Sequence, residues 1–237
     1  MIEVANLSHS FGDHPVLNEV SFRVDKGEFV FLTGRSGAGK TTLLRLLHGD
    51  LPVKNAWVSV AGFEMGGLIR RNLPLLRRQV AVVFQDFKIL DDRTVWENVA
   101  LPLEVLGLSR DQIARRVDAV ITSLGLFRMA NLNCVGLSGG EKQRVAIARA
   151  MVGGPKVILA DEPTGNLDQD TATRLLDVFK EFHAHGVTIL MATHNHSFIK
   201  ATPQARVLSL EDGRLRADTP SAFEQSSAAP ARQGNGQ

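Results

Sequence analysis

The stretch that decides the fold is Gly34-Arg35-Ser36-Gly37-Ala38-Gly39-Lys40-Thr41-Thr42, which lies between an apolar run at 28–33 and a leucine-rich run at 43–49. It matches the pattern G-x-x-x-x-G-K-[ST], in which glycines let successive backbone N–H groups point inward at a phosphate chain. Lys40 supplies a positive charge for the terminal phosphates, and the Thr41 hydroxyl is suited to ligate Mg²⁺. The helix expected from Lys40 onward also directs its positive end at this anion. We therefore predict a nucleoside-triphosphate site on a strand, a glycine-rich loop and a helix.

Length and composition limit the class of protein. The chain has 237 residues, 44% hydrophobic and 22% charged, which suits one large α/β domain with an inserted subdomain. The formal net charge of +2 is too balanced for a nucleic-acid binder, so we expect no nucleic-acid partner. The single cysteine, Cys134, excludes an internal disulfide, and we interpret it as a small buried hydrophobe.

The sequence also bears on membrane insertion. No apolar run reaches the roughly 18 residues that a membrane span needs. The N-terminus lacks the basic and apolar regions of a signal peptide. We therefore expect a cytosolic protein with no membrane span of its own, held at a membrane only through a partner.

Apolar runs elsewhere predict the sheets that carry the loop. Alternating apolar residues at 2–7 and 20–24 predict antiparallel strands beside the phosphate loop. Continuous apolar runs at 80–84, 157–160 and 187–192 predict parallel strands buried on both faces. Further strands are expected at 57–61, 206–210 and 214–216, the last two joined by a hairpin turn.

Between residues 94 and 153 the pattern changes to helices. The first helix, 94–106, contains Pro102, which we expect to kink or break it. The second and third begin at capping boxes, in which Ser109 is followed by Gln112 and Ser138 by Glu141. We predict an inserted helical subdomain over about 89–154.

Four polar residues follow the predicted parallel strands, at the edge where open α/β sheets bind ligands. Gln85 either reaches the nucleotide or is an ordinary polar loop residue, and its position alone does not decide. Asp161 is suited to hold Mg²⁺, and Glu162 to orient or deprotonate the attacking water. Without a phosphate loop upstream these carboxylates would indicate a solvated turn; with one, the functional interpretation is favoured. His194 becomes a candidate because it lies at the same edge.

Phe11 lies between the two antiparallel strands predicted at 2–7 and 20–24. We place it in a polar loop, Ser10-Phe11-Gly12-Asp13. An aromatic ring on a loop can stack on a nucleobase. Taken alone, however, the residue favours ordinary packing.

The motif Leu137-Ser138-Gly139-Gly140-Glu141 indicates a family. A capped helix start explains Ser138 and Glu141, but not the two glycines between them, which suit close approach of an anion to a helix N-terminus. In a helical insert between two nucleotide motifs, this motif resembles the signature of ABC-type ATPases. The resemblance covers about residues 1–216.

This resemblance implies a fold and a division of the chain. The fold is an α/β P-loop NTPase of ABC type, with a RecA-like, mostly parallel sheet, an antiparallel β subdomain and an inserted α-helical subdomain. Residues 1–217 would form a single ABC ATPase domain, with the core and antiparallel strands in 1–88 and 155–217 and the helical subdomain in about 89–154. We expect residues 218–237 to be a disordered tail.

The resemblance also implies how ATP and Mg²⁺ are bound. The loop 34–42 would hold the phosphates, and Phe11, where tyrosine is commoner, would stack on the base. The implied metal ligands are Thr41, Gln85 and Asp161. Gln85 would additionally couple the nucleotide to a membrane partner.

Catalysis and dimerisation follow from the same resemblance. Glu162 would be the catalytic base, and His194 the switch that contacts the γ-phosphate. Two copies would face head to tail, so that Ser138, Gly139, Gly140 and Glu141 of each cover the ATP of the other. Asp168, in the stretch Asn166-Leu167-Asp168, would belong to the loop that bridges the subunits.

Within the family, several stretches resemble the bacterial cell-division branch, whose ATPases work with an integral membrane protein of FtsX type. These stretches are 76–80, 84–86, 93–95, 98–103 and 191–194. The resemblance implies a homodimer that closes on Mg-ATP, moves the helices of an FtsX-like partner and so activates cell-wall hydrolases. It would lie at the cytoplasmic face of the bacterial inner membrane, peripheral through that partner.

Other functions remain open. The same stretches also resemble ATPases that energise lipoprotein release or MacB-type systems, and a transport ATPase would differ only in its membrane partner. ATP binding alone could drive the partner, with turnover incidental. Soluble ABC proteins that act on nucleic acid usually carry two ATPase cores or a long coiled-coil insert, and neither fits this chain.

Overall fold

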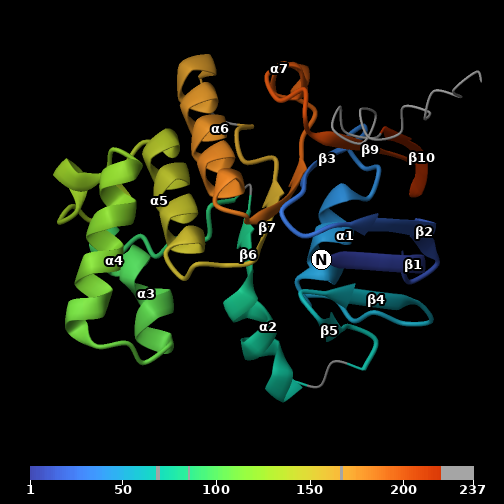
Figure 1. The fold of residues 1–237 in the computed structure, drawn as a ribbon, viewed down its shortest axis with the longest axis horizontal. Coiled ribbons are helices and arrows are strands. Elements are labelled where there is room, and N and C mark those ends of the chain that lie inside the picture. Colours follow the sequence, from blue (N-terminus) through green and yellow to red (C-terminus); the bar gives the residue numbers. More distant parts are fainter. Residues whose placement is uncertain (68–69, 85, 166–167, 220–237) are drawn as a thin grey trace, which may run out of the picture.

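The computed structural model describes residues 1–67, 70–84, 86–165 and 168–219. The strands are β1 Ile2–Phe11, β2 His14–Val24, β3 Phe29–Thr33, β4 Trp57–Val60, β5 Phe63–Glu64, β6 Val80–Val83, β7 Val157–Asp161, β8 Thr188–Ala192, β9 Arg206–Glu211 and β10 Arg214–Thr219. The helices are α1 Lys40–Leu47, α2 Leu73–Gln79, α3 Val95–Val105, α4 Arg110–Ser123, α5 Gly139–Met151, α6 Gln169–Ala184 and α7 His196–Lys200, with 3₁₀ turns at Arg70–Asn72, Phe127–Met129 and Cys134–Gly136. Helices α3–α5 lie at one end of the molecule and the antiparallel strands at the other (Figure 1).

The larger sheet has the strand order β10-β9-β3-β8-β7-β6. Its strands β9, β3, β8, β7 and β6 are parallel, and β10 is antiparallel to β9. The continuous apolar runs thus form parallel strands as predicted. Since β8 lies between β3 and β7, the segments that follow these three strands leave the sheet side by side at its carboxyl edge.

Burial on both faces explains why β3 is apolar throughout. Side chains alternate along a strand, and those of Val30 and Leu32 join a core with α1 and the antiparallel sheet. Phe29 and Phe31 join the other core, which contains α3–α6. The antiparallel sheet, in the order β2-β1-β4-β5, covers α1. The strand that carries the phosphate loop is therefore held from both sides.

The helical group α3–α5 has the two capping boxes predicted from the sequence and a third that was not predicted. Capping boxes are present at Ser109 and Ser138, and also at Thr94, whose side chain accepts a hydrogen bond from the backbone N–H of Glu97. Of the two outcomes expected at Pro102, a kink or a break, the break does not occur, because α3 continues through this residue to Val105. The reason is tertiary packing, because Val99 and Leu103 on either side of the proline are fully buried against the helical core.

Asn98 is a polar residue inside this apolar group, with no exposed surface. Its side chain accepts a hydrogen bond from the Leu90 N–H at 2.8 Å and donates to the carbonyls of Leu90 at 2.9 Å and Thr94 at 3.0 Å. Its amide also lies 3.3 Å from the sulfur of Cys134, which is buried as expected. This side chain is therefore one of the contacts that fix the segment from β6 to α3 to the helical group.

Strand β10 runs two residues past the expected end of the domain at 217. Strand β10 extends to Thr219, because the Asp218 carboxylate accepts hydrogen bonds from the guanidinium of Arg206 on β9. These bonds, with those to Glu28, raise the pKa of Arg206 further above its ordinary value. The rest of the predicted tail, 220–237, lies outside the described residues. Within the ranges that are described, no helix is long and apolar enough to cross a membrane.

Substituting Asn98 tests how much this side chain stabilises the fold. Asn98→Ala removes three hydrogen bonds and leaves the Leu90 N–H without a partner, while the Leu90 and Thr94 carbonyls keep their backbone donors, so we expect the free energy of unfolding to fall by about 2 kcal/mol. Urea denaturation measures it. Asn131→Ala, at an exposed position, is the control and should change stability by less than about 0.5 kcal/mol. Equal unfolding midpoints for the two variants would contradict the role given to Asn98.

Candidate active site

The glycine-rich loop packs too closely against its neighbours for side chains at two positions. A Cβ on Gly34, whose φ is +149°, would lie 2.2 Å from the carbonyl oxygen of Leu210. A Cβ on Gly39, at φ +103° before the first turn of α1, would lie 2.8 Å from the side chain of Leu17. Strands β9 and β2 thus pack closely against the loop. This packing leaves no room for a side chain at the two positions, and their positive φ angles also favour glycine.

Lys40 folds back into this curl. Its ammonium donates to the carbonyls of Gly34 at 2.8 Å and Arg35 at 3.2 Å, and lies 3.7 Å from Oε1 of Glu162. The lysine is only 8% exposed. A buried positive charge therefore lies between the loop and the end of β7, as the sequence predicts.

Asp161 is the last residue of β7 and is also buried. Burial raises the pKa of its carboxyl, and the negative charge of Glu162 adds to this, while a hydrogen bond with the Thr41 side chain opposes it. Its Oδ1 has no hydrogen-bond partner among the residues described. A carboxylate that is costly to ionise and has one unpaired oxygen is suited to a cation.

Glu162 has a left-handed backbone, with φ at +45°. Such a conformation costs about 1 kcal/mol or more for a residue other than glycine and is commonly found at functional sites. It is held because the Glu162 N–H donates to the Ala192 carbonyl at 2.9 Å and its own carbonyl accepts from the Gly165 N–H at 3.1 Å. This turn directs the carboxylate away from the sheet and toward the phosphate loop.

The same carboxylate reaches His194. Oε2 of Glu162 lies 3.0 Å from Nδ1 of the imidazole and 3.4 Å from the backbone nitrogen of His194. The preceding residue, Thr193, is fully buried and donates its N–H to the carbonyl of Leu32 on β3. The histidine side chain itself is 74% exposed. Lys40, Glu162 and His194, from three separate segments, therefore meet at one place.

The oxygen donors at this place fit Mg²⁺. Thr41 offers a hydroxyl and Asp161 a carboxylate, and Mg²⁺ typically uses one or two such protein ligands with phosphate oxygens and water. Over the described ranges, no group of three or more His, Cys, Asp or Glu side chains is close enough to hold a metal by itself. The third expected ligand, Gln85, lies outside the described residues.

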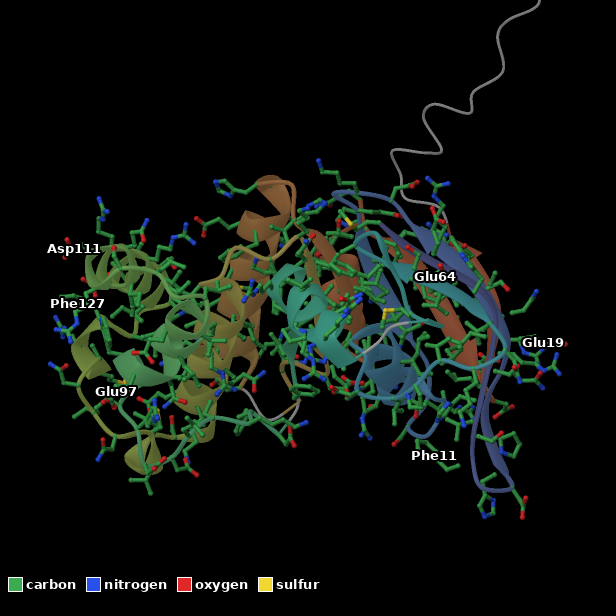
Figure 2. All side chains as sticks on the ribbon, turned by 90° about the horizontal axis from the view of Figure 1, so that it is seen from below. Phe11, Glu19, Glu64, Glu97, Asp111 and Phe127 are labelled. Atoms are coloured by element: carbon green, nitrogen blue, oxygen red, sulfur yellow. The ribbon has the colours of Figure 1, made fainter. Side chains whose placement is uncertain are left out.

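The prediction that Phe11 lies in a loop is wrong. Phe11 is the last residue of β1 and pairs with His14 across the hairpin. It is 47% exposed, and the ring of His9 meets it edge-on at 4.9 Å. Figure 2 shows it near the tip of the β1–β2 hairpin. Leu17 on β2, which pairs with His9, lies against Gly39, so Phe11 belongs to the same hairpin as a residue that contacts the phosphate loop.

The signature residues lie apart from this cluster. Ser138 donates its backbone N–H and its hydroxyl to Oε2 of Glu141, both at 2.7 Å, and these bonds lower the pKa of Glu141. No hydrogen bond of the described residues joins 138–141 to the phosphate loop. Asp168 caps α6 by accepting from the Thr171 N–H and hydroxyl, which lowers its pKa. Asn166 and Leu167 lie outside the described residues.

Arg149 is a residue of this region that the sequence analysis missed. Its guanidinium donates to the backbone carbonyls of Phe87 at 3.2 Å and Lys88 at 2.6 Å, and burial lowers its pKa. Both acceptor residues have left-handed backbones, with φ at +57° and +47°. The bonds tie the segment after β6 to the helix that begins with the signature motif. The signal in the sequence that could have identified Arg149 is a charged residue between Ala148 and Met151, which are both on the apolar face of the predicted helix.

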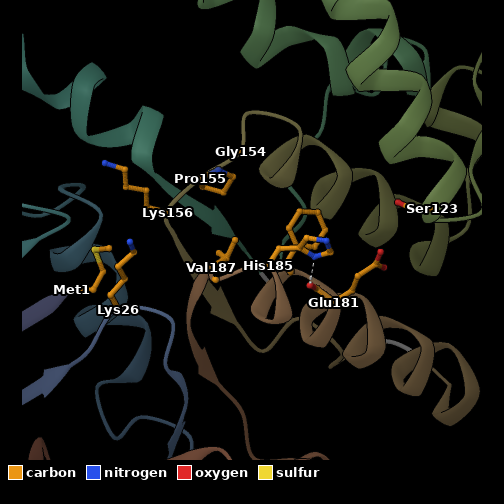
Figure 3. A pocket seen from close by; sticks show the side chains of 11 residues that line it. Met1, Lys26, Ser123, Gly154, Pro155, Lys156, Glu181, His185 and Val187 are labelled. Carbon is orange, nitrogen blue, oxygen red and sulfur yellow. Dashed lines mark hydrogen bonds between the residues drawn. The ribbon is translucent and has the colours of Figure 1, made fainter.

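A pocket of about 480 Å³ lies at the opposite edge of the sheet. Figure 3 shows it lined by residues such as Lys26, Lys156 and Val187, at the amino ends of β3, β7 and β8. It contains none of the predicted site residues. This pocket is therefore separate from the cluster at the carboxyl edge.

Comparison with known proteins shows the family. The ABC transporter family model matches residues 17–165, more than half of the chain. The chain is 46% identical over 216 residues to the cell division ATP-binding protein FtsE of Escherichia coli (strain K12), covering 91% of this chain and 97% of that protein. It is 47% identical over 204 residues to FtsE of Mycobacterium tuberculosis (strain ATCC 25618 / H37Rv), covering 86% and 88%.

A solved structure gives the same result for the fold. The ATP-binding cassette MJ0796, described as a dimer in a post-hydrolysis state bound to ADP and Pi, superposes with a TM-score of 0.85 at 30% identity. The match covers 93% of this chain and 98% of that one. The predicted fold class and family are confirmed, and the dimeric neighbour supports homodimerisation. This chain belongs to the ABC transporter family, and it is an ATP-binding cassette of ABC type with ATPase activity.

Proposed function

We propose that this cassette dimerises on Mg-ATP and uses hydrolysis at Glu162 to drive an FtsX-like membrane partner in cell division. The observation that carries the catalytic part is the meeting of Lys40, Glu162 and His194 beside the glycine-rich loop. The cell-division part is supported by the FtsE relatives, which match nearly the whole chain.

ATP binds with its phosphates in the loop 34–42. The ammonium of Lys40 exchanges its bonds to the loop carbonyls for bonds to the terminal phosphates, which carry more charge than a carbonyl. Backbone N–H groups at the start of α1 complete the cradle. Phe11, beside the loop and half-exposed, stacks on the base.

Thr41 and Asp161, together with Gln85, would hold Mg²⁺. When bound, the metal would neutralise negative charge on the phosphates. The residues of this chain arrange that site: Asp161 presents an unpaired buried oxygen, and the hydroxyl of Thr41 holds the carboxylate in place.

Glu162 is the general base. A water attacks the γ-phosphorus while the bond to the bridging oxygen of ADP breaks, and Glu162 takes the proton that the water loses. The left-handed turn at Glu162 aims its carboxylate at this water. His194, whose Nδ1 lies 3.0 Å from Oε2 of Glu162 and whose side chain is 74% exposed, contacts the γ-phosphate through its other ring nitrogen.

The signature motif acts on a second copy. Gly139 has no neighbour within 4 Å of a Cβ and no positive φ, so the chain's own packing gives no reason for glycine there. A bare helix start leaves room for an anion to approach its N–H groups. We assign that anion as the ATP of the partner copy, with Asp168 in the loop that bridges the two.

The membrane partner docks beside the segment that follows Gln85. A groove of about 940 Å³ lies there between α2, β6, α3 and α5. Closure of the dimer favours one position of the helical group over another, so hydrolysis shifts the partner between two states. The cassette is then peripheral at the cytoplasmic face of the bacterial inner membrane, and the partner relays the motion to cell-wall hydrolases.

Removing the lysine tests the phosphate site. Lys40→Ala should weaken ATP binding at least about tenfold, because it removes a charge-assisted contact worth about 1.5–3 kcal/mol. Equilibrium binding of a fluorescent ATP analogue measures this. Lys26→Ala, at the opposite edge of the sheet, is the matched control and should bind like the parent. Unchanged affinity of the Lys40 variant would exclude Lys40 from the site.

Asp161→Asn tests the metal carboxylate through stability. Burial raises the pKa of Asp161 in the folded state, so the folded chain binds this proton more tightly and the group favours folding more as the pH falls. At about pH 7 the ionised carboxylate is costly, and the nucleotide-free variant should unfold at higher urea than the parent. The difference in stability should shrink as the pH falls toward the raised pKa of Asp161. In the variant, ATP hydrolysis should no longer respond to added Mg²⁺. Asp177→Asn, on the exposed face of α6, should show neither effect.

Glu162→Gln tests the general base. The variant should keep ATP affinity but hydrolyse ATP at least about a hundredfold more slowly, and so accumulate as an ATP-bound dimer. Phosphate release and light scattering measure these two properties, with Glu181→Gln on α6 as the control. Hydrolysis near the parent rate would show that Glu162 is not the base.

The same trapped variant tests the biological function. Purified from bacterial membranes with ATP present, it should retain a four-helix membrane protein of FtsX type whose loss blocks septation. A transporter permease in its place would keep the ATPase mechanism and replace the cell-division function with transport.

A further inference from the structure

The hairpin of β9 and β10 packs against a strand that supports the phosphate loop. Its two-residue turn, Asp212-Gly213, has positive φ angles at both positions, +47° and +72°, as a type I′ turn requires. The carbonyl of Gly213 accepts a hydrogen bond from the backbone N–H of Asn18 on β2 at 2.8 Å. Figure 1 shows β10 beside β2. The turn is therefore fixed to β2, although the two segments lie at opposite ends of the chain.

The turn approaches β2 so closely that only glycine fits at its second position. A Cβ on Gly213 would overlap the carbonyl oxygen of Val16 and lie 3.2 Å from the Cα of Leu17. Both are backbone atoms, which cannot turn aside as the end of a flexible side chain can. A side chain at position 213 would therefore displace this part of β2.

The same two residues of β2 also contact the phosphate loop. A Cβ on Gly39 would lie 3.0 Å from the carbonyl oxygen of Val16 and 2.8 Å from the side chain of Leu17. Gly39 directly precedes Lys40, the first residue of α1. A displacement of Val16 and Leu17 would therefore reach the end of the loop, where the first turn of α1 offers its N–H groups to an anion.

The hairpin also contacts the beginning of the loop. The carbonyl of Leu210 on β9 leaves no room for a Cβ on Gly34. The carbonyl of Gly34 in turn accepts a hydrogen bond from the ammonium of Lys40 at 2.8 Å. One hairpin thus contacts the first glycine of the loop directly and the last glycine through β2. The separation of the two ends of the loop depends on where this hairpin lies.

We propose that Gly213 is a positioning residue for ATP, because its turn holds β2 against Gly39 and so sets the shape in which the phosphate loop binds nucleotide. The inference rests on the proposed place of ATP in the loop 34–42, and adds a residue that lies outside the nucleotide motifs. The loop holds the phosphates before and during the reaction, so its shape affects the binding of ATP and of the transition state alike. A substitution at Gly213 should therefore raise KM and leave kcat nearly unchanged.

The hairpin of β4 and β5 offers a matched control. Its turn, Ala61-Gly62, also has positive φ angles at both positions, +51° and +85°. Apart from its chain neighbours, no atom of the described residues lies within 4 Å of a Cβ on Gly62. Alanine at either glycine therefore has the same left-handed backbone, but only alanine at 213 meets β2.

The test compares Gly213→Ala with Gly62→Ala in the full-length chain. Both variants should unfold at lower urea than the parent, because both place alanine at a positive φ angle. Only Gly213→Ala should raise KM for ATP, by about tenfold, with kcat within about twofold of the parent. Equilibrium binding of a fluorescent ATP analogue should weaken by the same factor. A KM equal to that of Gly62→Ala, or a loss confined to kcat, would overturn the proposal.

Hydrogen exchange in the parent chain tests the same coupling without a substitution, and decides the matter if Gly213→Ala does not fold. Coupling between two equilibria is reciprocal, so a turn that favours nucleotide binding must itself open less often when nucleotide is bound. With saturating ADP, which fills the loop without closing the dimer, the Asn18 amide should exchange about tenfold more slowly. The Ala61 amide, which donates to the Met1 carbonyl at 2.9 Å in the control turn, should keep its rate. Equal exchange at Asn18 with and without ADP would contradict the role of the turn.

The Lys40→Ala variant separates this inference from the proposed function. Parent-like ATP affinity of Lys40→Ala would overturn the phosphate site itself, whatever Gly213→Ala does. Weak binding by Lys40→Ala together with parent-like binding by Gly213→Ala would overturn only the role of Gly213, and the proposed function would stand.

Discussion

The position of β8 between β3 and β7 is the constraint on which the rest of the structure depends. Because the three strands are parallel, the phosphate loop, the Asp161–Glu162 pair and His194 all leave the sheet at one edge. The backbone of Thr193 is bonded to Leu32 and that of Glu162 to Ala192, so each segment is held by the neighbouring strand. A cluster built this way is as rigid as the sheet, and catalysis needs groups held within a fraction of an ångström.

The residues of the candidate site lower the stability of the nucleotide-free fold. Asp161 is buried with an oxygen that has no partner among the residues described, and Glu162 occupies an unfavourable backbone region. Each feature costs free energy in the nucleotide-free chain. The two apolar cores on either face of β3 offset that cost. Metal and nucleotide would satisfy these groups, which couples ligand binding to stability.

The segment from β6 to α3 joins the catalytic edge to the groove. Asn98 bonds to Leu90 at one end of it, and Arg149 bonds to the carbonyls of Phe87 and Lys88 in its middle. Arg149 lies on α5, the helix that starts with the signature motif. One short segment therefore connects the carboxyl edge of the sheet with the groove.

The amino-acid sequence by itself determined the family, the parallel strands and the position along the chain of most side chains in the candidate site, because these follow from local patterns. A glycine-rich loop, apolar runs and capping boxes each depend on neighbours within a few residues, as at Gly34–Thr42 and Ser138–Glu141. Tertiary structure alone decided three other features. Helix α3 passes through Pro102 because its flanking residues are buried; Phe11 belongs to a strand because His14 pairs with it; and Arg149 meets a loop about 60 residues earlier in the chain. These outcomes depend on contacts between distant segments, whose energies exceed local propensity and leave no pattern in the sequence around them.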